Sequence, residues 1–300
     1  MRLNHKVVVP LVNEILDEYD FKLTIRQIYY RLMSHPYNYF SVRDKKYHSL
    51  IQMLRREREN GTIDWHRIED RHRSTHGGDD YFDSPDDFIN VLKGTIRESW
   101  KGYIRTMWDD QNYKVELWIE KDAESSLAIQ VADNYNVLVF TTKGPSSLTW
   151  VKLAVERLVE FANKEIVILH FGDHDPSGIM MSRDLQRRFS RYGAEEGLEH
   201  IRVKRIGLNM DQIDELNLIS SGKAKRTDPN FNAYIKEFGT DEVWEMDALP
   251  PDELKSIIVK SINKYVNNKE RWNEKIKETS EEKVEVKKKV SEMMSKLDKP

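Results

Sequence analysis

Three acidic residues in the middle of the chain have the types and positions needed to bind a metal ion. Glu120 follows the apolar run 115–119, and Asp173 and Asp175 follow a second apolar run, 165–171. Runs of this length that alternate with helical stretches predict βαβ units, which place the carboxyl ends of parallel strands at one edge of a sheet. We therefore expect the three carboxylates to converge at that edge, where open α/β sheets usually hold their sites.

Carboxylates gathered in one place repel one another, and a bound cation or a raised pKa relieves that repulsion. Oxygen ligands suit Mg²⁺, which keeps several waters and is typically shared with substrate phosphates, and the sequence contains no Cys. Asp173 and Asp175 also have a simpler interpretation, because either carboxylate could cap the helix that follows Pro176. The spacing alone leaves both interpretations open, and Glu120 favours the metal site.

A third apolar run, 137–140, ends at the same expected edge and is followed by the segment Thr141–Ser147. This segment sets Lys143 beside a glycine and before a hydroxyl-rich helix start. Backbone N–H groups and a cation in that arrangement can bind a phosphate. We expect Lys143 to contact a phosphate, although the segment lacks the full P-loop pattern.

Near the amino end, Thr24 and Gln27 have the spacing of a capping box, which predicts a helix that begins at Thr24. Tyr29 falls on the apolar stripe of this helix, whereas Tyr30 falls off it, one turn after Arg26. We therefore expect the Tyr30 hydroxyl to be exposed beside a guanidinium, which favours the ionised, nucleophilic phenol. The alternative is that both tyrosines are ordinary residues of an amphipathic helix.

The surrounding segment predicts a DNA-docking arrangement. A first helix is expected from Pro10 to about Tyr19, a third from about Asp44 to Asn60, and a short strand or wing at Thr62–Trp65. Residues 22–73 contain twelve Lys or Arg against six Asp or Glu, a surplus of six in a chain of net charge −3. A solvated charged face is the alternative to DNA contacts. The residues expected to contact phosphates are Lys45, Lys46, Arg55, Arg56 and Arg58.

Three parts of the sequence carry a family resemblance. The order of Glu120, Lys143-Gly144 and Gly172–Gly178 resembles the Toprim domain of the topoisomerase VI A subunit and of the meiotic double-strand-break transesterase. Trp244–Pro250 is similar to the closing part of that Toprim region. Thr24–Tyr30 resembles the family's active-tyrosine motif, with Gln27 where the family usually has an acidic residue.

The resemblance implies an α/β fold in which a winged-helix domain is followed by a Toprim domain. We expect the winged helix at residues 1–75, a linker and helix at 76–112, and the Toprim domain at 113–268, with a mainly parallel sheet flanked by helices. A charged helix is expected at 269–300, with an apolar stripe that packs on the body or on a second subunit.

The chemistry implied by the resemblance is DNA cleavage and rejoining of the type IIB topoisomerase kind. Tyr30 would attack a DNA phosphate to form a phosphotyrosyl link while Arg26 stabilises charge. Asp173 and Asp175 would hold Mg²⁺, and Glu120 would be a further ligand or the acid/base for the leaving 3′ oxygen. Two alternatives stay open: a Toprim nuclease that uses a metal-activated water, and a DNA-binding protein without catalysis.

Expected partners are double-stranded DNA, a second copy of the chain and a separate ATPase subunit. In the family, the tyrosine of one subunit meets the metal site of the other. The 300 residues are 33% charged and 39% hydrophobic, and the sequence contains neither an apolar run of membrane length nor the apolar core of a signal peptide. We expect a prokaryotic, cytoplasmic, nucleoid-associated protein without membrane contact.

Overall fold

The chain divides into two compact units in the computed structural model, and each unit is described by itself. The model describes residues 3–69, 81–120, 125–141 and 148–297. Unit 1 comprises residues 1–72 and 113–265, and unit 2 comprises residues 73–112 and 266–300. None of the helices in the described ranges has the length and apolarity needed to cross a membrane.

Unit 1 begins with three helices, α1 (His5–Asp17), α2 (Ile25–Met33) and α3 (Tyr47–Glu59). The prediction that the first helix starts at Pro10 is wrong, because the Asn4 side chain caps it earlier by accepting a hydrogen bond from the Lys6 N–H at 3.2 Å. Pro10 therefore lies inside α1. The α2 capping box is confirmed: Thr24 Oγ1 accepts from the Gln27 N–H at 3.1 Å, and Gln27 Oε1 accepts from the Thr24 N–H at 2.9 Å.

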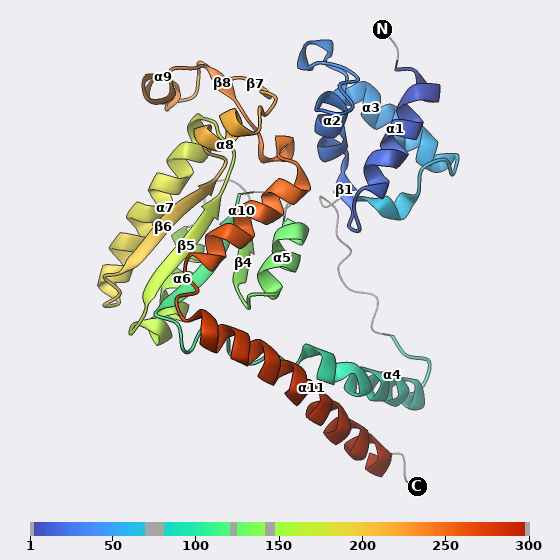
Figure 1. Cartoon of the computed structure of the whole chain (residues 1–300), viewed down its shortest axis with the longest axis vertical. Helices are drawn as coiled ribbons and strands as arrows, with labels where there is room; N and C mark the ends of the chain where they lie inside the picture. The colour runs from blue at the N-terminus through green and yellow to red at the C-terminus, as the bar shows by residue number, and fades with distance from the viewer. Residues whose placement is uncertain (1–2, 70–80, 121–124, 142–147, 298–300) are drawn as a thin grey trace. The chain divides into compact units, whose positions relative to one another are not determined.

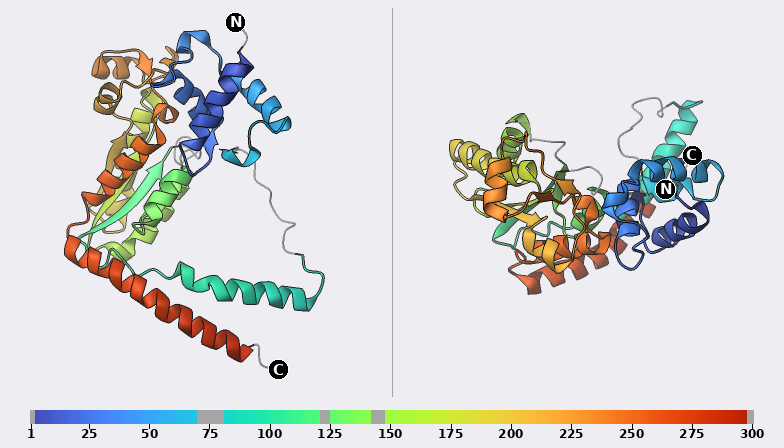
Figure 2. Two further views of the ribbon diagram at one scale, coloured as in Figure 1. Left: turned by 45° about the vertical axis from the view of Figure 1, so that its right-hand side comes forward. Right: turned by 90° about the horizontal axis from the view of Figure 1, so that it is seen from above.

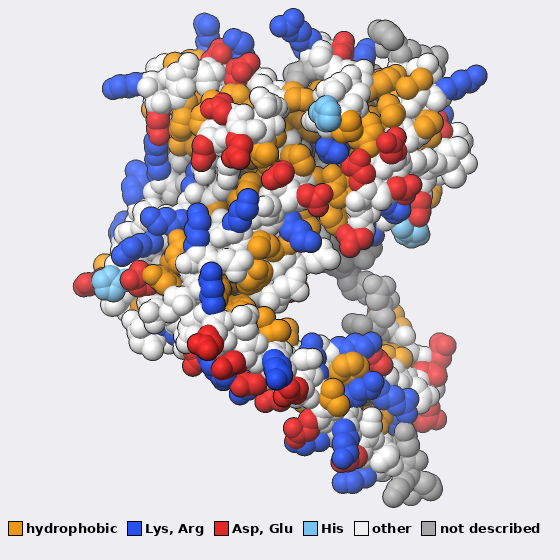
Figure 3. Space-filling model, in the orientation of Figure 1, with side chains coloured by type: hydrophobic (Ala, Val, Ile, Leu, Met, Phe, Trp, Pro, Cys, Tyr) orange, Lys and Arg blue, Asp and Glu red, His pale blue; other side chains and the backbone are white. Residues whose placement is uncertain are grey.

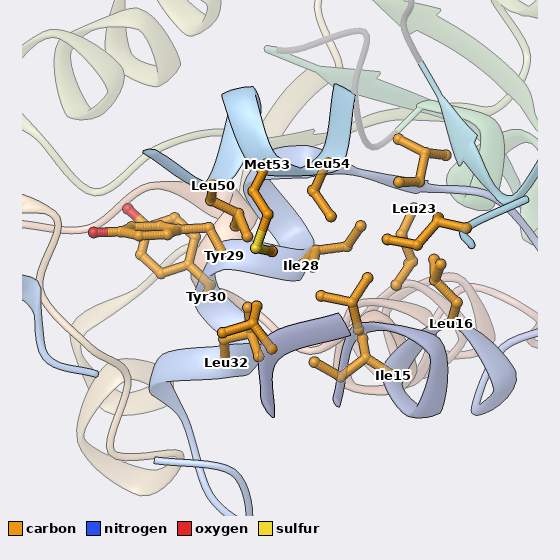
Figure 4. Packing of buried hydrophobic residues seen from close by; sticks show 14 of the residues in the cluster. Ile15, Leu16, Leu23, Ile28, Tyr29, Tyr30, Leu32, Leu50, Met53 and Leu54 are labelled. Carbon is orange, nitrogen blue, oxygen red and sulfur yellow. The ribbon is translucent and has the colours of Figure 1, made fainter. Parts of the chain in front are cut away.

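The three helices enclose an aliphatic core, shown in Figure 4. Ile15, Ile28, Leu32 and Leu54 in this core are completely shielded from solvent. Tyr29 and Tyr30 lie at one side of it, and their hydroxyls point away from the aliphatic side chains. The Tyr29 ring packs against Tyr47 at the start of α3 and against Phe40, whereas the Tyr30 hydroxyl reaches residues outside the three helices.

The expected strand or wing at Thr62–Trp65 is wrong. Thr62 Oγ1 donates to the Glu57 carbonyl at 2.9 Å, which ties the chain to the end of α3, and Asp64 then caps the 3₁₀ helix Trp65–Arg67. The strand comes later, as β2 (Ile68–Glu69), and it pairs in parallel with β1 (Leu23–Thr24). In the described residues this part is a helical bundle with a two-residue parallel pair.

The second part of unit 1 is built on a four-stranded parallel sheet in the order β4-β3-β5-β6 (Figure 1). The three strands expected from the apolar runs are confirmed, as is a fourth strand that the run 201–208 predicts. Their bounds are β3 (Tyr113–Ile119), β4 (Leu138–Thr141), β5 (Glu165–Phe171) and β6 (Ile201–Gly207). Ile119 pairs with Thr141 on one side and with Phe171 on the other, and Phe171 pairs with Gly207, so all four strands end at the same level.

Helices cover both faces of this sheet, which makes the architecture α/β (Figures 1 and 2). On one face α6 (Leu148–Leu158) and α7 (Pro176–Glu195) pack together over Trp118, Ile166 and Ile168. On the other face α5 (Ser125–Asp133) packs against α10 (Pro251–Asn263). The shorter elements are η1 (Val42–Asp44), η4 (Val159–Phe161), α8 (Met210–Glu215), β7 (Gly222–Lys223), α9 (Phe231–Phe238), β8 (Glu242–Val243) and η5 (Met246–Ala248).

Unit 2 contains α4 (Pro85–Glu98), η3 (Ser99–Gly102) and the long α11 (Lys269–Leu297). Trp108 packs edge-on against Trp272, with ring centroids 5.2 Å apart, and Lys275 donates to the Thr106 carbonyl at 2.8 Å. These contacts join two segments that are more than 150 residues apart in the sequence. Within the unit, the α4 side chains Phe88, Val91 and Leu92 are exposed, and Figure 3 shows hydrophobic side chains among the charged ones.

The capping box at the start of α2 allows a direct test of how the tyrosine-bearing helix is stabilised. Replacing Thr24 by Ala removes the hydroxyl that accepts the Gln27 N–H, so the free energy of unfolding should fall by about 1 kcal/mol. Urea unfolding followed by circular dichroism measures this change. Thr24→Ser keeps the hydroxyl and should retain most of the stability. Equal midpoints for Thr24→Ala and wild type would show that the box contributes nothing.

Candidate active site

The carboxyl ends of β3 and β5 bring Glu120 to the loop that contains Asp173. Glu120 Oε2 accepts a hydrogen bond from the Asp173 backbone N–H at 3.1 Å. The two residues are 53 positions apart in the sequence, and the parallel pairing of β3 with β5 accounts for their proximity. The expected meeting of Glu120 with the loop after β5 is therefore observed.

Two glycines make room for this approach. A Cβ atom on Gly172 would lie 2.6 Å from Glu120 Oε2, and one on Gly178 would lie 2.3 Å from the Asp173 carbonyl oxygen. Real Cβ atoms do not come so close to backbone or carboxylate oxygens. The glycines of the segment Gly172–Gly178 thus allow the acidic side chain and the first turn of α7 to pack against the loop.

A buried arginine, Arg205, binds the backbone of the loop that follows β5. Arg205 on β6 donates to the carbonyl oxygens of Gly172, Asp173, Gly178 and Leu208 at 2.6–3.1 Å, and to Ser182 Oγ at 2.9 Å. Burial lowers the pKa of Arg205 to about 10, and the carboxylates of Glu120, Asp173 and Asp175 act in the opposite direction. The guanidinium is therefore the cation that offsets the acidic edge within the described residues.

Sequence reasoning missed Arg205. On β6, Arg202 and Lys204 alternate with Val203, and a strand of strict alternation would place the next charged side chain at position 206. The pairing of β5 with β6 shifts between His170 and Phe171, and this irregularity accompanies the break in alternation at Arg205. The sequence did contain one signal for Arg205: it is a charged residue that breaks the alternation of a strand next to an acidic loop.

Asp173 and Asp175 both bind backbone amides. Asp175 Oδ1 accepts from the Gly178 N–H at 2.6 Å and is the N-cap of α7, which is the simpler of the two interpretations of the sequence. Asp173 is 6% exposed, and its Oδ1 accepts from the Met246 N–H at 2.8 Å. These bonds fix the loop in place, and they connect it to the segment 244–248.

His174, between the two aspartates, is buried in an aromatic pocket. Its Nδ1 lies 2.8 Å from the Tyr234 hydroxyl, and its ring packs against Phe238 and Trp244. Burial, and then the charge of Arg205, lower the pKa of His174 to about 4. The imidazole is therefore neutral at physiological pH and has a structural role in this loop.

Tyr30 on α2 is 6% exposed, which contradicts the expected solvent position. Its hydroxyl donates to Ser221 Oγ at 2.8 Å and reaches Glu245 Oε2 at 3.3 Å. Helical periodicity could not reveal this, because the residues that cover Tyr30 lie 191 and 215 positions further along the chain. The paired Tyr29 is buried as expected, and it packs edge-on against Tyr30.

The charge environment of Tyr30 also differs from the expectation. Burial, and then the Glu245 carboxylate, raise the pKa of the Tyr30 phenol well above its usual value, while Ser221 and Arg26 act more weakly in the opposite direction. Arg26 forms an ion pair with Glu245. In this arrangement the phenol is held protonated.

The segment 244–248 connects the acidic edge to the tyrosine. Trp244 exchanges two backbone hydrogen bonds with His174, at 2.8 and 3.0 Å, and the Met246 N–H binds Asp173. Glu245 between them contacts Arg26 and Tyr30. Ala248 is buried in the same core as the three amino-terminal helices. The motif that resembled the closing part of a Toprim region thus lies between both candidate sites.

The basic residues of α3 are partly engaged with their own neighbours. Arg55 forms an ion pair with Glu59 at 3.2 Å, and Arg58 stacks over the Trp65 ring at 4.9 Å from its centroid. Lys45 and Arg56 are exposed, and Lys46 is half-buried at the start of the helix. Lys143 lies outside the described residues.

The donor set suits a hard cation with few protein ligands. Among the described residues, no three His, Asp or Glu side chains form a ready metal-binding group. Mg²⁺ usually takes only one or two carboxylates and completes its shell with water and substrate phosphates. The expected convergence of all three carboxylates into one group is therefore not observed, and a Mg²⁺ ion here would take only one or two of Glu120, Asp173 and Asp175.

The sequence matches no known family model and no curated protein. The family resemblance therefore depends on the sequence motifs themselves.

The glycine at position 178 gives a direct test of the loop. Gly178→Ala places a Cβ atom against the Asp173 carbonyl, so the free energy of unfolding should fall by roughly 1–3 kcal/mol. Thermal and urea unfolding measure the change. Gly94, on α4, has open space around its Cα, and Gly94→Ala should not destabilise the protein. A Gly178→Ala protein as stable as wild type would contradict the close packing of this loop.

Buried His174 predicts a pH dependence of stability. The pKa of His174 is lowered in the folded chain, so the unfolded chain binds the extra proton first, and stability is lost as pH falls from 6.5 toward 4. Over that whole range the loss is roughly 3 kcal/mol. Urea unfolding between about pH 7 and pH 5 should therefore show a smaller slope for His174→Gln than for wild type. Exposed His200→Gln is the control, and parallel curves for wild type and His174→Gln would exclude this role.

Proposed function

We propose that this protein is a Mg²⁺-dependent DNA-cleaving and rejoining enzyme of the topoisomerase VI A-subunit type, with a winged-helix-like amino-terminal part and a Toprim-like sheet domain. One observation carries the proposal. The Tyr30–Arg26 pair and the acidic edge around Asp173 lie in one compact unit, and residues 244–248 bind to both.

In the proposed reaction, Tyr30 Oη attacks the phosphorus of a DNA phosphodiester. The bond from phosphorus to the 3′ oxygen breaks, the phenolic proton passes from Tyr30 to bulk water, and the 3′ oxygen gains a proton from an acid, for which Glu120 is the candidate. The product is a 5′-phosphotyrosyl link and a free 3′-hydroxyl. Reversal of the same step rejoins the strand without external energy, because one ester replaces another.

Charge on the phosphate is handled by fixed groups. Arg26 would bind the non-bridging oxygens, which a planar guanidinium does well. Asp173 and Asp175 would hold Mg²⁺, which when bound supplies Lewis-acid stabilisation of the phosphate and of the leaving oxygen, and Glu120 would be either a further ligand or the acid. Arg205 would keep these carboxylates in position by holding the loop carbonyls.

The remaining parts of the proposal concern partners. Lys45, Lys46, Arg55, Arg56, Arg58 and Lys143 would contact the phosphates of double-stranded DNA. A homodimer would place two tyrosines on the two strands, and a separate ATPase subunit would be needed for strand passage. The proposed location is the nucleoid of a prokaryotic cell.

A nuclease is the second candidate function, and one observation favours it. The Tyr30 phenol is buried, hydrogen-bonded and held protonated, whereas a metal-activated water at the acidic edge would need no change at Tyr30. The two candidates differ in whether the cut DNA carries protein. A DNA-binding protein without catalysis would leave the DNA intact.

The deciding experiment incubates the protein with supercoiled plasmid and Mg²⁺, stops the reaction with SDS, and compares gels with and without protease. A transesterase gives nicked or linear DNA that carries protein until protease is added. Tyr30→Phe should reduce this product by at least about a thousandfold, because the nucleophile is lost. Tyr29→Phe, which removes the neighbouring hydroxyl, should keep it.

Two other outcomes of this experiment would support the alternative functions. Cut DNA with free ends that persists in Tyr30→Phe would support the nuclease. Intact plasmid in every lane, with Mg²⁺-independent DNA binding, would support a binding protein and would sink the transesterase unless addition of a partner ATPase restores cleavage.

A further inference from the structure

Two groups with expected roles in the reaction converge on a single oxygen atom of the chain itself. Glu245 Oε2 accepts a hydrogen bond from the Arg26 guanidinium and lies 3.3 Å from the Tyr30 hydroxyl. Because Glu245 contributes a full negative charge, this oxygen is an anion bound by both the arginine and the tyrosine.

A DNA phosphate would need the same position. For transesterification the tyrosine oxygen must contact the phosphate, and the guanidinium must bind its non-bridging oxygens. Carboxylate and phosphate oxygens are alternative partners for the planar donor face of arginine. An anion within reach of both Tyr30 Oη and Arg26 therefore stands where the scissile phosphate would bind.

We propose that Glu245 is a placeholder for the scissile phosphate, which occupies Arg26 and holds Tyr30 inactive until DNA displaces it. The proposal rests on the proposed role of Tyr30 as the nucleophile. It assigns to Glu245 a regulatory role at that site, because the resting chain satisfies Arg26 with its own carboxylate.

The solvent exposure of Arg26 and Glu245 is consistent with displacement of Glu245 by a DNA phosphate that arrives from solvent. The side chains of Arg26 and Glu245 are 37% and 29% exposed, whereas Tyr30 is 6% exposed. An incoming polyanion can therefore reach the ion pair before it reaches the phenol. An ion pair this open to solvent is weak enough to exchange for phosphates, which a duplex offers at high local density.

Ser221 completes the resting arrangement. Its hydroxyl accepts from Tyr30 at 2.8 Å and from the Glu245 backbone N–H at 2.9 Å, so one side chain fixes both the phenol and the backbone of the placeholder. The backbone on the far side of Glu245 is fixed by the bond from the Met246 N–H to Asp173. Because the backbone is held on both sides, rotation of the Glu245 side chain alone can vacate the position.

The test measures the affinity for a short labelled DNA duplex by fluorescence anisotropy in EDTA, where no cleavage occurs. Glu245→Gln keeps the shape but removes the charge, and should tighten binding by about fivefold, the value of a partly exposed ion pair. Glu242→Gln removes an equal charge three residues away, on an exposed side chain, and should change the affinity by less than about twofold.

A double-mutant cycle shows whether the effect acts through Arg26. In an Arg26→Gln background, the gain from Glu245→Gln should vanish, since no guanidinium remains to be released. A merely structural role of Glu245 would leave the gain unchanged or reverse it. Circular dichroism checks the fold, and Ser221→Ala, which loosens the same arrangement without changing any charge, replaces Glu245→Gln if that variant fails to fold.

Three results would overturn the placeholder. Equal affinities of Glu245→Gln and Glu242→Gln would do so, as would a gain that persists without Arg26. Unchanged affinity with loss of the protein-linked DNA would instead make Glu245 the base that deprotonates Tyr30. Failure of the proposed function appears separately, as cleavage that is absent or insensitive to Tyr30→Phe, while the affinity ratio still decides the role of Glu245.

Discussion

The bonds from Arg205 to the loop after β5 are the interaction on which the rest of the candidate site depends. One guanidinium binds four carbonyl oxygens and one hydroxyl, and it thereby fixes both the loop and the first turn of α7. Burying an arginine is costly unless its donors are satisfied and its charge is compensated. Here carbonyl and hydroxyl oxygens bind the two terminal nitrogens of Arg205, whereas its Nε is buried without a hydrogen-bond partner, and the acidic edge supplies the compensating charge. The acids and the arginine therefore stabilise each other in the fold before any substrate or metal is present.

The acidic edge also uses backbone amides. Glu120, Asp173 and Asp175 each accept one N–H, from Asp173, Met246 and Gly178 respectively. Such bonds restrict the side chains to one geometry, which reduces the entropy lost when a ligand binds. An Asp that caps a helix and an Asp that awaits a cation are thus compatible roles for one residue.

The sequence predicted those parts of the fold that local periodicity determines. The four parallel strands and the capping box of α2 were confirmed, because alternating apolar runs and cap spacing are short-range signals. Tyr30 and Arg205 were missed for a common reason. The environment of Tyr30 comes from Ser221 and Glu245, and the position of Arg205 follows a register shift between two strands. Both are long-range features, and the sequence records only the second, as a charged residue that breaks the alternation of β6.

Residues 244–248 connect the acidic edge at Asp173 to the site at Arg26 and Tyr30, which are far apart in the sequence. The Met246 amide is bonded to Asp173, and the preceding residue, Glu245, is bonded to Arg26. If a ligand at Asp173 or at Arg26 shifts residues 244–248, binding at one site must change the affinity at the other. If a cation bound at Asp173 changed the affinity for an anion at Arg26, the bound anion would change the affinity for the cation by the same factor. Binding at the two sites would thus be coupled through the five residues 244–248.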